Sequence, residues 1–65
     1  DSLLASAWAL HQAGRWDEAE GAYLRLLAAR PRDADVVNCF GILLLQSGRA
    51  RDARDLYRAF VAHAP

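Results

Sequence analysis

LHQAGRWDEAEGAY at residues 10–23 recurs, with changes, as LLQSGRARDARDLY at residues 44–57. The two stretches begin 34 residues apart and keep a glycine, an arginine, an alanine and a tyrosine at the same places. The same shift pairs Asp1 with Asp35 and Pro31 with Pro65, so the matches run through the whole 34-residue unit. The chain is therefore predicted to be a duplicated module, because a chance match would not extend over both halves of the unit.

Each unit is predicted to fold as two helices joined by a short turn. Apolar residues recur at helical spacing in four segments, which are residues 2–13, 17–30, 35–47 and 51–63. Connections this short make successive helices antiparallel neighbours. We expect an all-α fold of four antiparallel helices, with a first unit at residues 1–33 and a second at residues 34–65.

Glycine, proline and aspartate mark the expected helix ends. Gly14 and Gly48 suit the left-handed conformation that follows many helices, and Pro31 cannot donate the next backbone hydrogen bond. Asp17 is predicted to cap the second helix, with a glutamate three residues later completing a capping box. The third helix is predicted to open at one of the two aspartates at positions 33 and 35.

Small residues at equivalent places predict where the helices cross. Position 7 of the first unit is alanine where the second has Gly41, and Ala19 corresponds to Ala53. A tyrosine follows each of these alanines by four residues and is expected to pack over the contact. The segment 35–47 is nearly apolar all round, so it is expected to be covered on most sides.

These residues resemble the tetratricopeptide repeat, a 34-residue helix–turn–helix motif. The second unit carries the motif as Val37, Phe40-Gly41, Leu44, Ala53, Tyr57 and Pro65, and the first as Leu3, Ser6-Ala7, Leu10, Ala19, Tyr23 and Pro31. The resemblance implies two tandem repeats that form a segment of a right-handed α-superhelix, within a longer bacterial protein. Ser6, where the family has leucine, weakens the first core and suggests a repeat at the end of an array.

The resemblance also implies a partner-binding groove, because arrays of this family present the first helix of each unit on a concave face. The residues this places on the groove are Leu4, Trp8, His11, Asn38, Ile42 and Leu45. Each triplet follows i, i+4, i+7 spacing and forms one stripe. The stripes are mostly apolar, so the expected partner is an apolar peptide or an amphipathic helix of another protein.

Five side chains invite a more chemical interpretation. Trp8 is either a groove anchor or packs against a repeat outside this chain, and Trp16 is expected to be structural. His11 is expected to be solvated, without a carboxylate or second histidine one turn away, and His63 lies at the end of the last helix. Cys39 is interpreted as a small core residue and not as a reactive thiol.

The composition argues against several classes of function. The eight basic residues, all arginine, balance eight acidic ones, so we expect neither nucleic-acid nor membrane binding. One cysteine forms no internal disulfide, and no Cys/His set has zinc spacing, so we expect no metal or cofactor. With no nucleophile–base pair and no secretory signal, we expect a non-enzymatic cytoplasmic protein.

Three hypotheses for function remain. The first is a protein–protein interaction module of the scaffold or chaperone type. The second is an appendage of a larger bacterial enzyme, such as a glycosyltransferase, that presents substrate or mediates self-association. The third is a homodimer through uncapped repeat ends, because an array usually needs at least three units and a polar cap.

Overall fold

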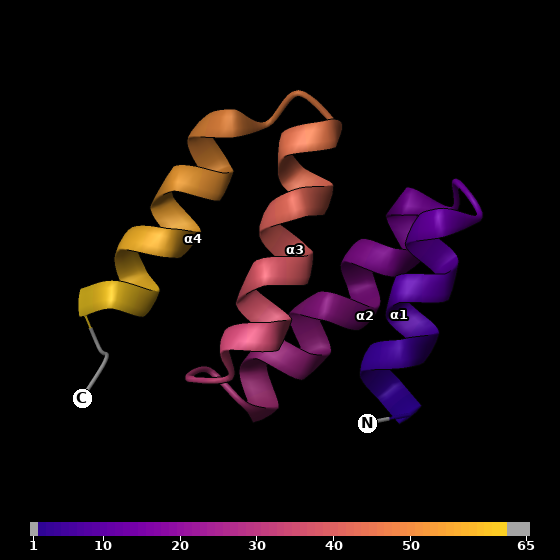
Figure 1. The fold of residues 1–65 in the computed structure, drawn as a ribbon, viewed down its shortest axis with the longest axis horizontal. Coiled ribbons are helices and arrows are strands. Elements are labelled where there is room, and N and C mark those ends of the chain that lie inside the picture. The colour runs from indigo at the N-terminus through magenta and orange to yellow at the C-terminus, as the bar shows by residue number, and fades with distance from the viewer. Residues whose placement is uncertain (1, 63–65) are drawn as a thin grey trace.

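The computed structural model describes residues 2–62, which form four helices (Figure 1). They are α1 (Ser2–Gln12), α2 (Trp16–Ala29), α3 (Ala34–Gln46) and α4 (Ala50–Ala62). The described residues contain no strand, and each helix end lies within one residue of its predicted position. The all-α fold of two tandem helix–turn–helix units, α1–α2 and α3–α4, is thus confirmed. His63 and Pro65 lie outside the described residues.

The turns within the two units have the same geometry. Gly14 and Gly48 adopt φ values of 80° and 78°, in the left-handed region that glycine enters without steric cost. The amide of Arg15 donates to the Leu10 carbonyl at 3.0 Å, and that of Arg49 donates to the Leu44 carbonyl at 2.8 Å. These six-to-one bonds satisfy helix-end carbonyls in the Schellman manner, which confirms the predicted role of both glycines.

The helix starts follow the sequence prediction in one case and not in the other. At α3, the Asp33 carboxylate accepts hydrogen bonds from the amides of Asp35 at 2.9 Å and Val36 at 3.4 Å, so Asp33 is the cap. At α2, the prediction that Asp17 caps the helix is wrong. The helix begins at Trp16, directly after the Schellman turn, and Asp17 lies inside its first turn, where the helix dipole favours a negative charge.

The core lies where the helices cross at their small residues. Ala7, Ala19 and Ala53 are buried, and a methyl group added at Gly41 would overlap the Tyr57 hydroxyl. Tyr57 therefore packs over the close contact as the sequence predicts, and Tyr23 is buried in the same core cluster as Ala7 and Ala19. The Cα atoms span 33 × 26 × 13 Å, so the molecule is a slab with little interior. Because the slab is this thin, each unit depends on its neighbour to shield its apolar side chains from water.

Helix α3 joins the two units. Each helix packs against the next along the chain, and α1 also contacts α3 (Figure 1). The side chains of α3 that are buried are Val36, Val37, Phe40, Leu43 and Leu44. The Phe40 ring stacks on that of Tyr23 in α2, with centroids 5.8 Å apart. The expectation that this apolar helix is covered on most sides is confirmed, and its exposed positions are Ala34, Asp35, Asn38, Leu45 and Gln46.

Candidate interaction surface

Helices α1 and α3, the first helices of the two units, contact each other, and we call the surface that these two helices contribute the α1–α3 face. Of the predicted site residues, Leu4 and Trp8 lie on α1 and Asn38, Ile42 and Leu45 lie on α3. Leu4 and Ile42 are half-buried, and Asn38 is exposed. The side chains of Trp8 and Leu45 are 36% and 53% exposed, which is high for large apolar residues. Their contact with a partner stays a prediction.

His11, the sixth predicted site residue, is buried. It is only 3% exposed, so the prediction that it is solvated is wrong. Its Nε2 lies 2.6 Å from Oε1 of Gln46 in α3, and its Nδ1 lies 3.5 Å from the Tyr23 hydroxyl. A neutral ring with its proton on Nε2 satisfies both contacts, because it donates to the amide oxygen and accepts from the hydroxyl.

Gln46 is the residue of this site that sequence reasoning missed. It lies one turn beyond Ile42, at the end of α3, and it joins the second unit to the histidine of the first. The available signal was the pair of glutamines at positions 12 and 46, which the repeat retains. That signal was ambiguous, because both glutamines are exposed and only Gln46 has a histidine opposite.

Aromatic rings surround the buried histidine. The Trp8 and Trp16 rings meet that of His11 edge-on, with centroids 5.0 and 6.2 Å away. The Trp16 indole also donates a hydrogen bond of 3.2 Å to the His11 carbonyl. These contacts support the structural interpretation of Trp16. They also hold one edge of the Trp8 ring against His11, while about a third of the residue's surface stays exposed.

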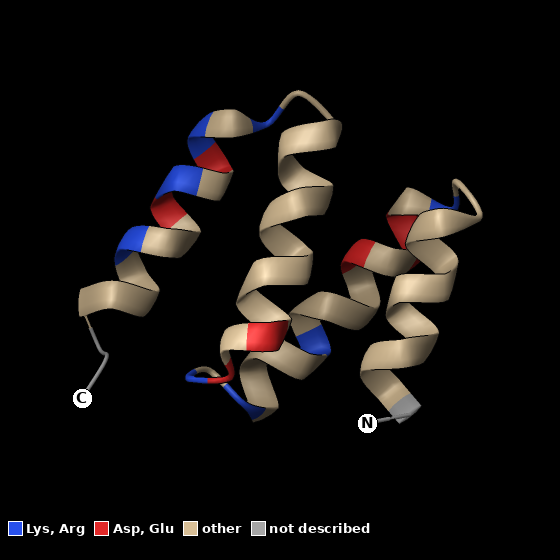
Figure 2. Cartoon of the chain, viewed as in Figure 1, with Lys and Arg blue, Asp and Glu red and all other residues tan. Residues whose placement is uncertain are grey.

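Charged residues are almost absent from the α1–α3 face. Helix α1 carries no carboxylate, lysine or arginine among its described side chains, and α3 carries only Asp35 at its first turn (Figure 2). The arginines and acids are concentrated on α2, on α4 and in the connections. A charged group placed against such a surface would lose water without gaining an ion pair.

Cys39 lies half-buried against the core, beside the α1–α3 face. Burial raises the pKa of its thiol, and the carboxylates of Asp35 and Asp33 raise it further. A raised pKa leaves little thiolate at neutral pH, and the thiolate is the reactive form. The position and protonation of Cys39 therefore fit the interpretation of a structural residue.

Among the described residues, no group of three or more His, Cys, Asp or Glu side chains could hold a metal ion. None of the helices α1 to α4 is long and apolar enough to cross a membrane.

A flat stack of helix–turn–helix units, each covering the next, defines a helical-repeat protein of the solenoid class. The family model of the tetratricopeptide repeat matches residues 2–37, which is more than half of the chain. The chain therefore belongs to the tetratricopeptide repeat family, as its sequence motif predicts. Repeats of this family are typically non-catalytic modules for protein–protein interaction. No curated protein and no solved structure matches the chain.

Proposed function

We propose that the α1–α3 face binds an apolar segment of another protein, most simply the apolar side of an amphipathic helix. The observation that carries the proposal is an exposed Trp8 on α1, a helix without charged side chains among its described residues, together with an exposed Leu45 on α3, whose one charged side chain is Asp35 at its first turn. Tryptophan is enriched among residues that dominate binding energy, and large exposed apolar patches mark interaction sites. A scaffold or chaperone role would use this face in the same way.

The experiment follows the emission of Trp8. In a Trp16→Phe background, Trp8 is the only tryptophan, and its emission should shift to the blue as a synthetic amphipathic helical peptide with an uncharged apolar face covers it. A matched peptide with glutamates on that face should produce no shift. Because Trp8 reports directly on the proposed contact, the readout does not depend on knowing the natural partner.

Two variants separate binding from folding. Ile42→Asp should abolish peptide capture while circular dichroism shows unchanged helicity, because Ile42 is only half-buried. Leu24→Asp, a matched change at an exposed leucine of α2, should leave capture intact. Loss of helicity in Ile42→Asp would assign Ile42 to the core, and equal binding by all variants would refute the proposed face.

A further inference from the structure

Imidazole is the side chain that ordinarily gains a charge between about pH 5 and 8, and one imidazole lies between the two units. His11 is 3% exposed, and its Nε2 lies 2.6 Å from Oε1 of Gln46 in α3. This hydrogen bond joins α1 of the first unit to α3 of the second. A change in the charge of His11 therefore acts directly on the contact between the units.

The hydrogen bonds around His11 fit a neutral ring. Nε2 donates to Gln46, and Nδ1 accepts from the Tyr23 hydroxyl at 3.5 Å. In this form every buried polar atom among the described side chains has a partner. A proton on Nδ1 would set two donors against each other and deprive the Tyr23 hydroxyl of its acceptor. Because Tyr23 is fully buried, water cannot replace that acceptor.

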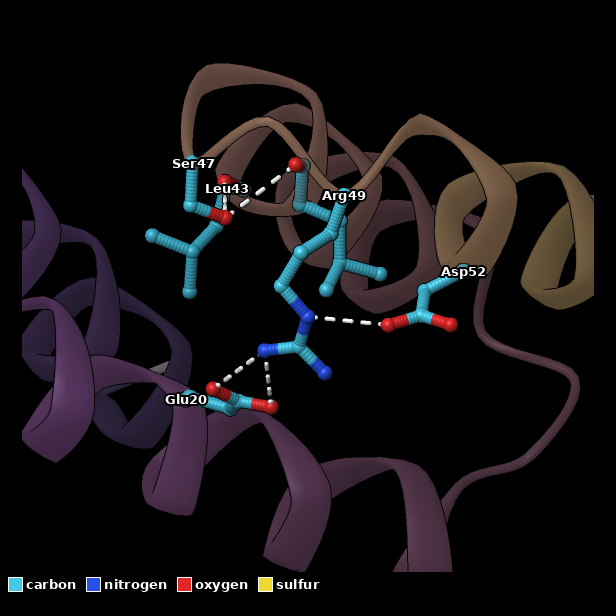
Figure 3. A network of polar contacts seen from close by, with 6 residues as sticks. Glu20, Leu43, Ser47, Arg49 and Asp52 are labelled. Carbon is cyan, nitrogen blue, oxygen red and sulfur yellow. Dashed lines mark hydrogen bonds and ion pairs between the residues drawn. The ribbon is translucent and has the colours of Figure 1, made fainter.

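No carboxylate of α1 or α2 pairs with the His11 ring. Helix α1 contains no acidic residue. On α2, Glu18 and Glu20 each pair with an arginine, at 2.9 and 2.8 Å, and Asp17 is exposed in the first turn. Figure 3 shows Glu20 directed toward Arg49, in the turn after α3. None of the ion pairs between described residues includes His11.

The helices of the second unit also bring no negative charge to His11. Gln46 presents an uncharged amide, and the one carboxylate of α3, that of Asp35, lies at the other end of the helix. Burial raises the pKa of the Cys39 thiol and raises that of Tyr23 to about 12, so both groups are neutral in acid. Helix α4 does not contact α1. A proton on His11 would thus place an unpaired charge in a buried site, which is unfavourable.

We propose that His11 is a proton-sensitive joint between the two units. The ring stays neutral while α1 packs on α3, and it takes up a proton once the two helices separate. At pH 7.5 the ring is neutral in both forms, so stability is unaffected. As the pH falls through about 6.5, where a solvated histidine titrates, the separated form binds a proton that the packed form does not. The packed form therefore loses stability in acid.

The first experiment measures urea unfolding by circular dichroism at pH 7.5 and 5.5. The unfolding equilibrium constant should rise about tenfold, which is the change for one histidine that is protonated in the unfolded chain alone. Carboxylates contribute little in this range, because they titrate at about pH 4. His63→Gln removes the other histidine of the chain and should keep the rise, whereas His11→Gln should remove most of it.

A second experiment supplies the missing charge. Gln46→Glu places a carboxylate where the amide oxygen now accepts from Nε2 of His11. This carboxylate stabilises the protonated ring in the packed form, so the loss of stability in acid should disappear or reverse. Gln46 is exposed, so the new charge remains solvated at neutral pH. Gln12→Glu, the matched change at an exposed glutamine of α1, should retain the loss in acid.

A measurement on the folded chain covers the case in which a variant at position 11 or 46 fails to fold. In His63→Gln, the carbon-bound imidazole protons of His11 are the only ones of their kind, so NMR follows them without ambiguity. At pH 5.5 without urea, these protons should keep the chemical shifts of a neutral ring in the folded population.

Three results would overturn the proposal. One is an imidazole signal of the folded chain that titrates at about pH 6.5, since the surrounding aromatic rings would then accommodate the charge. Another is a loss of stability in acid that is equally large in His11→Gln. The third is an unchanged loss in Gln46→Glu. None of these results bears on peptide capture by Trp8, so the two proposals can fail separately.

Discussion

Tyr23 and Tyr57 occupy the same place in the two units, yet Tyr23 is fully buried and Tyr57 is only half-buried. The same contrast separates buried His11 from exposed Leu45 at the ends of α1 and α3. In each pair the first unit has a neighbour on its C-terminal side among the described residues. Burial at these positions is therefore decided by the next helix pair and not by the residue type, as expected for an architecture in which units contact only their neighbours.

The largest expected change in stability comes from removing the two tyrosine rings in separate variants. Tyr23→Ala should lower the free energy of unfolding by about 3–5 kcal/mol, the usual cost of deleting a large buried aromatic ring. A small domain has little more stability than this, so the variant should be largely unfolded without denaturant. Tyr57→Ala should cost clearly less, since its ring is partly solvated. Urea unfolding followed by circular dichroism measures both, and equal costs would refute the role of the neighbouring unit.

The second test uses the ionisation of the buried tyrosine. Burial, with a smaller contribution from Cys39, raises the pKa of Tyr23 from about 10 in the unfolded chain to about 12 in the fold. Below pH 10 both states keep the proton and stability is unaffected. Between pH 10 and 12 the unfolded state loses it first, so the free energy of unfolding should fall by about 2–3 kcal/mol.

The control for the alkaline transition is Tyr23→Phe. This variant keeps the ring that stacks on Phe40 but has no hydroxyl to ionise. Its stability should vary much less between pH 10 and 12 when urea unfolding is repeated across that range. An identical alkaline loss in Tyr23→Phe would show that another group causes the transition.

The architecture could be predicted from the sequence because it depends on residues that the repeat duplicates. Gly14 and Gly48 fix the turns, and the small residues fix the crossings, by backbone geometry that is local to each unit. The start of α2 could not be predicted correctly, because the turn at Gly14 leads into a helix that begins at Trp16, one residue before Asp17. A capping aspartate and one inside the first turn give the same sequence signal there.

The site was only partly predictable. Helical spacing placed Leu4, Trp8, Asn38, Ile42 and Leu45 on the first helices of their units, and that depends on the periodicity alone. The burial of His11 depends on Gln46, which is 35 residues away and belongs to the other unit. Periodicity within one helix carries no information about such a contact. In the sequence, a contact between the two units is indicated by matched positions at which the units carry different residues.

The third test concerns this contact between the units. Gln46→Ala should cost about 1–2 kcal/mol of unfolding free energy, because it leaves the buried Nε2 of His11 without its acceptor. Gln12→Ala, the matched change in the first unit, should have almost no effect, since the Gln12 side chain has no hydrogen-bond partner among the described residues. Chemical denaturation of both variants gives the comparison. Equal effects would indicate loss of helix propensity or local contacts and not loss of the histidine contact.

The smallest expected effect distinguishes two arginines at the same place in the repeat. Arg15 pairs at 2.9 Å with Glu18, three residues along its own helix, whereas Arg49 bridges Asp52 at 2.8 Å and Glu20 of the other unit (Figure 3). Hydrogen bonds to Asp52 and Glu20 raise the pKa of Arg49, so it stays charged throughout the accessible pH range. Both arginines are exposed, and exposed ion pairs contribute little to stability.

Arg49→Ala should therefore lower the denaturation midpoint slightly, and more than Arg15→Ala, when measured in low salt. The difference should vanish at about 1 M salt, where charges more than about 3 Å apart are screened. A double-mutant cycle of Arg49→Ala with Glu20→Ala isolates the contact between the units. A coupling of zero at low salt would show that the pair adds no stability, and the distinction between the units would then depend on buried contacts alone.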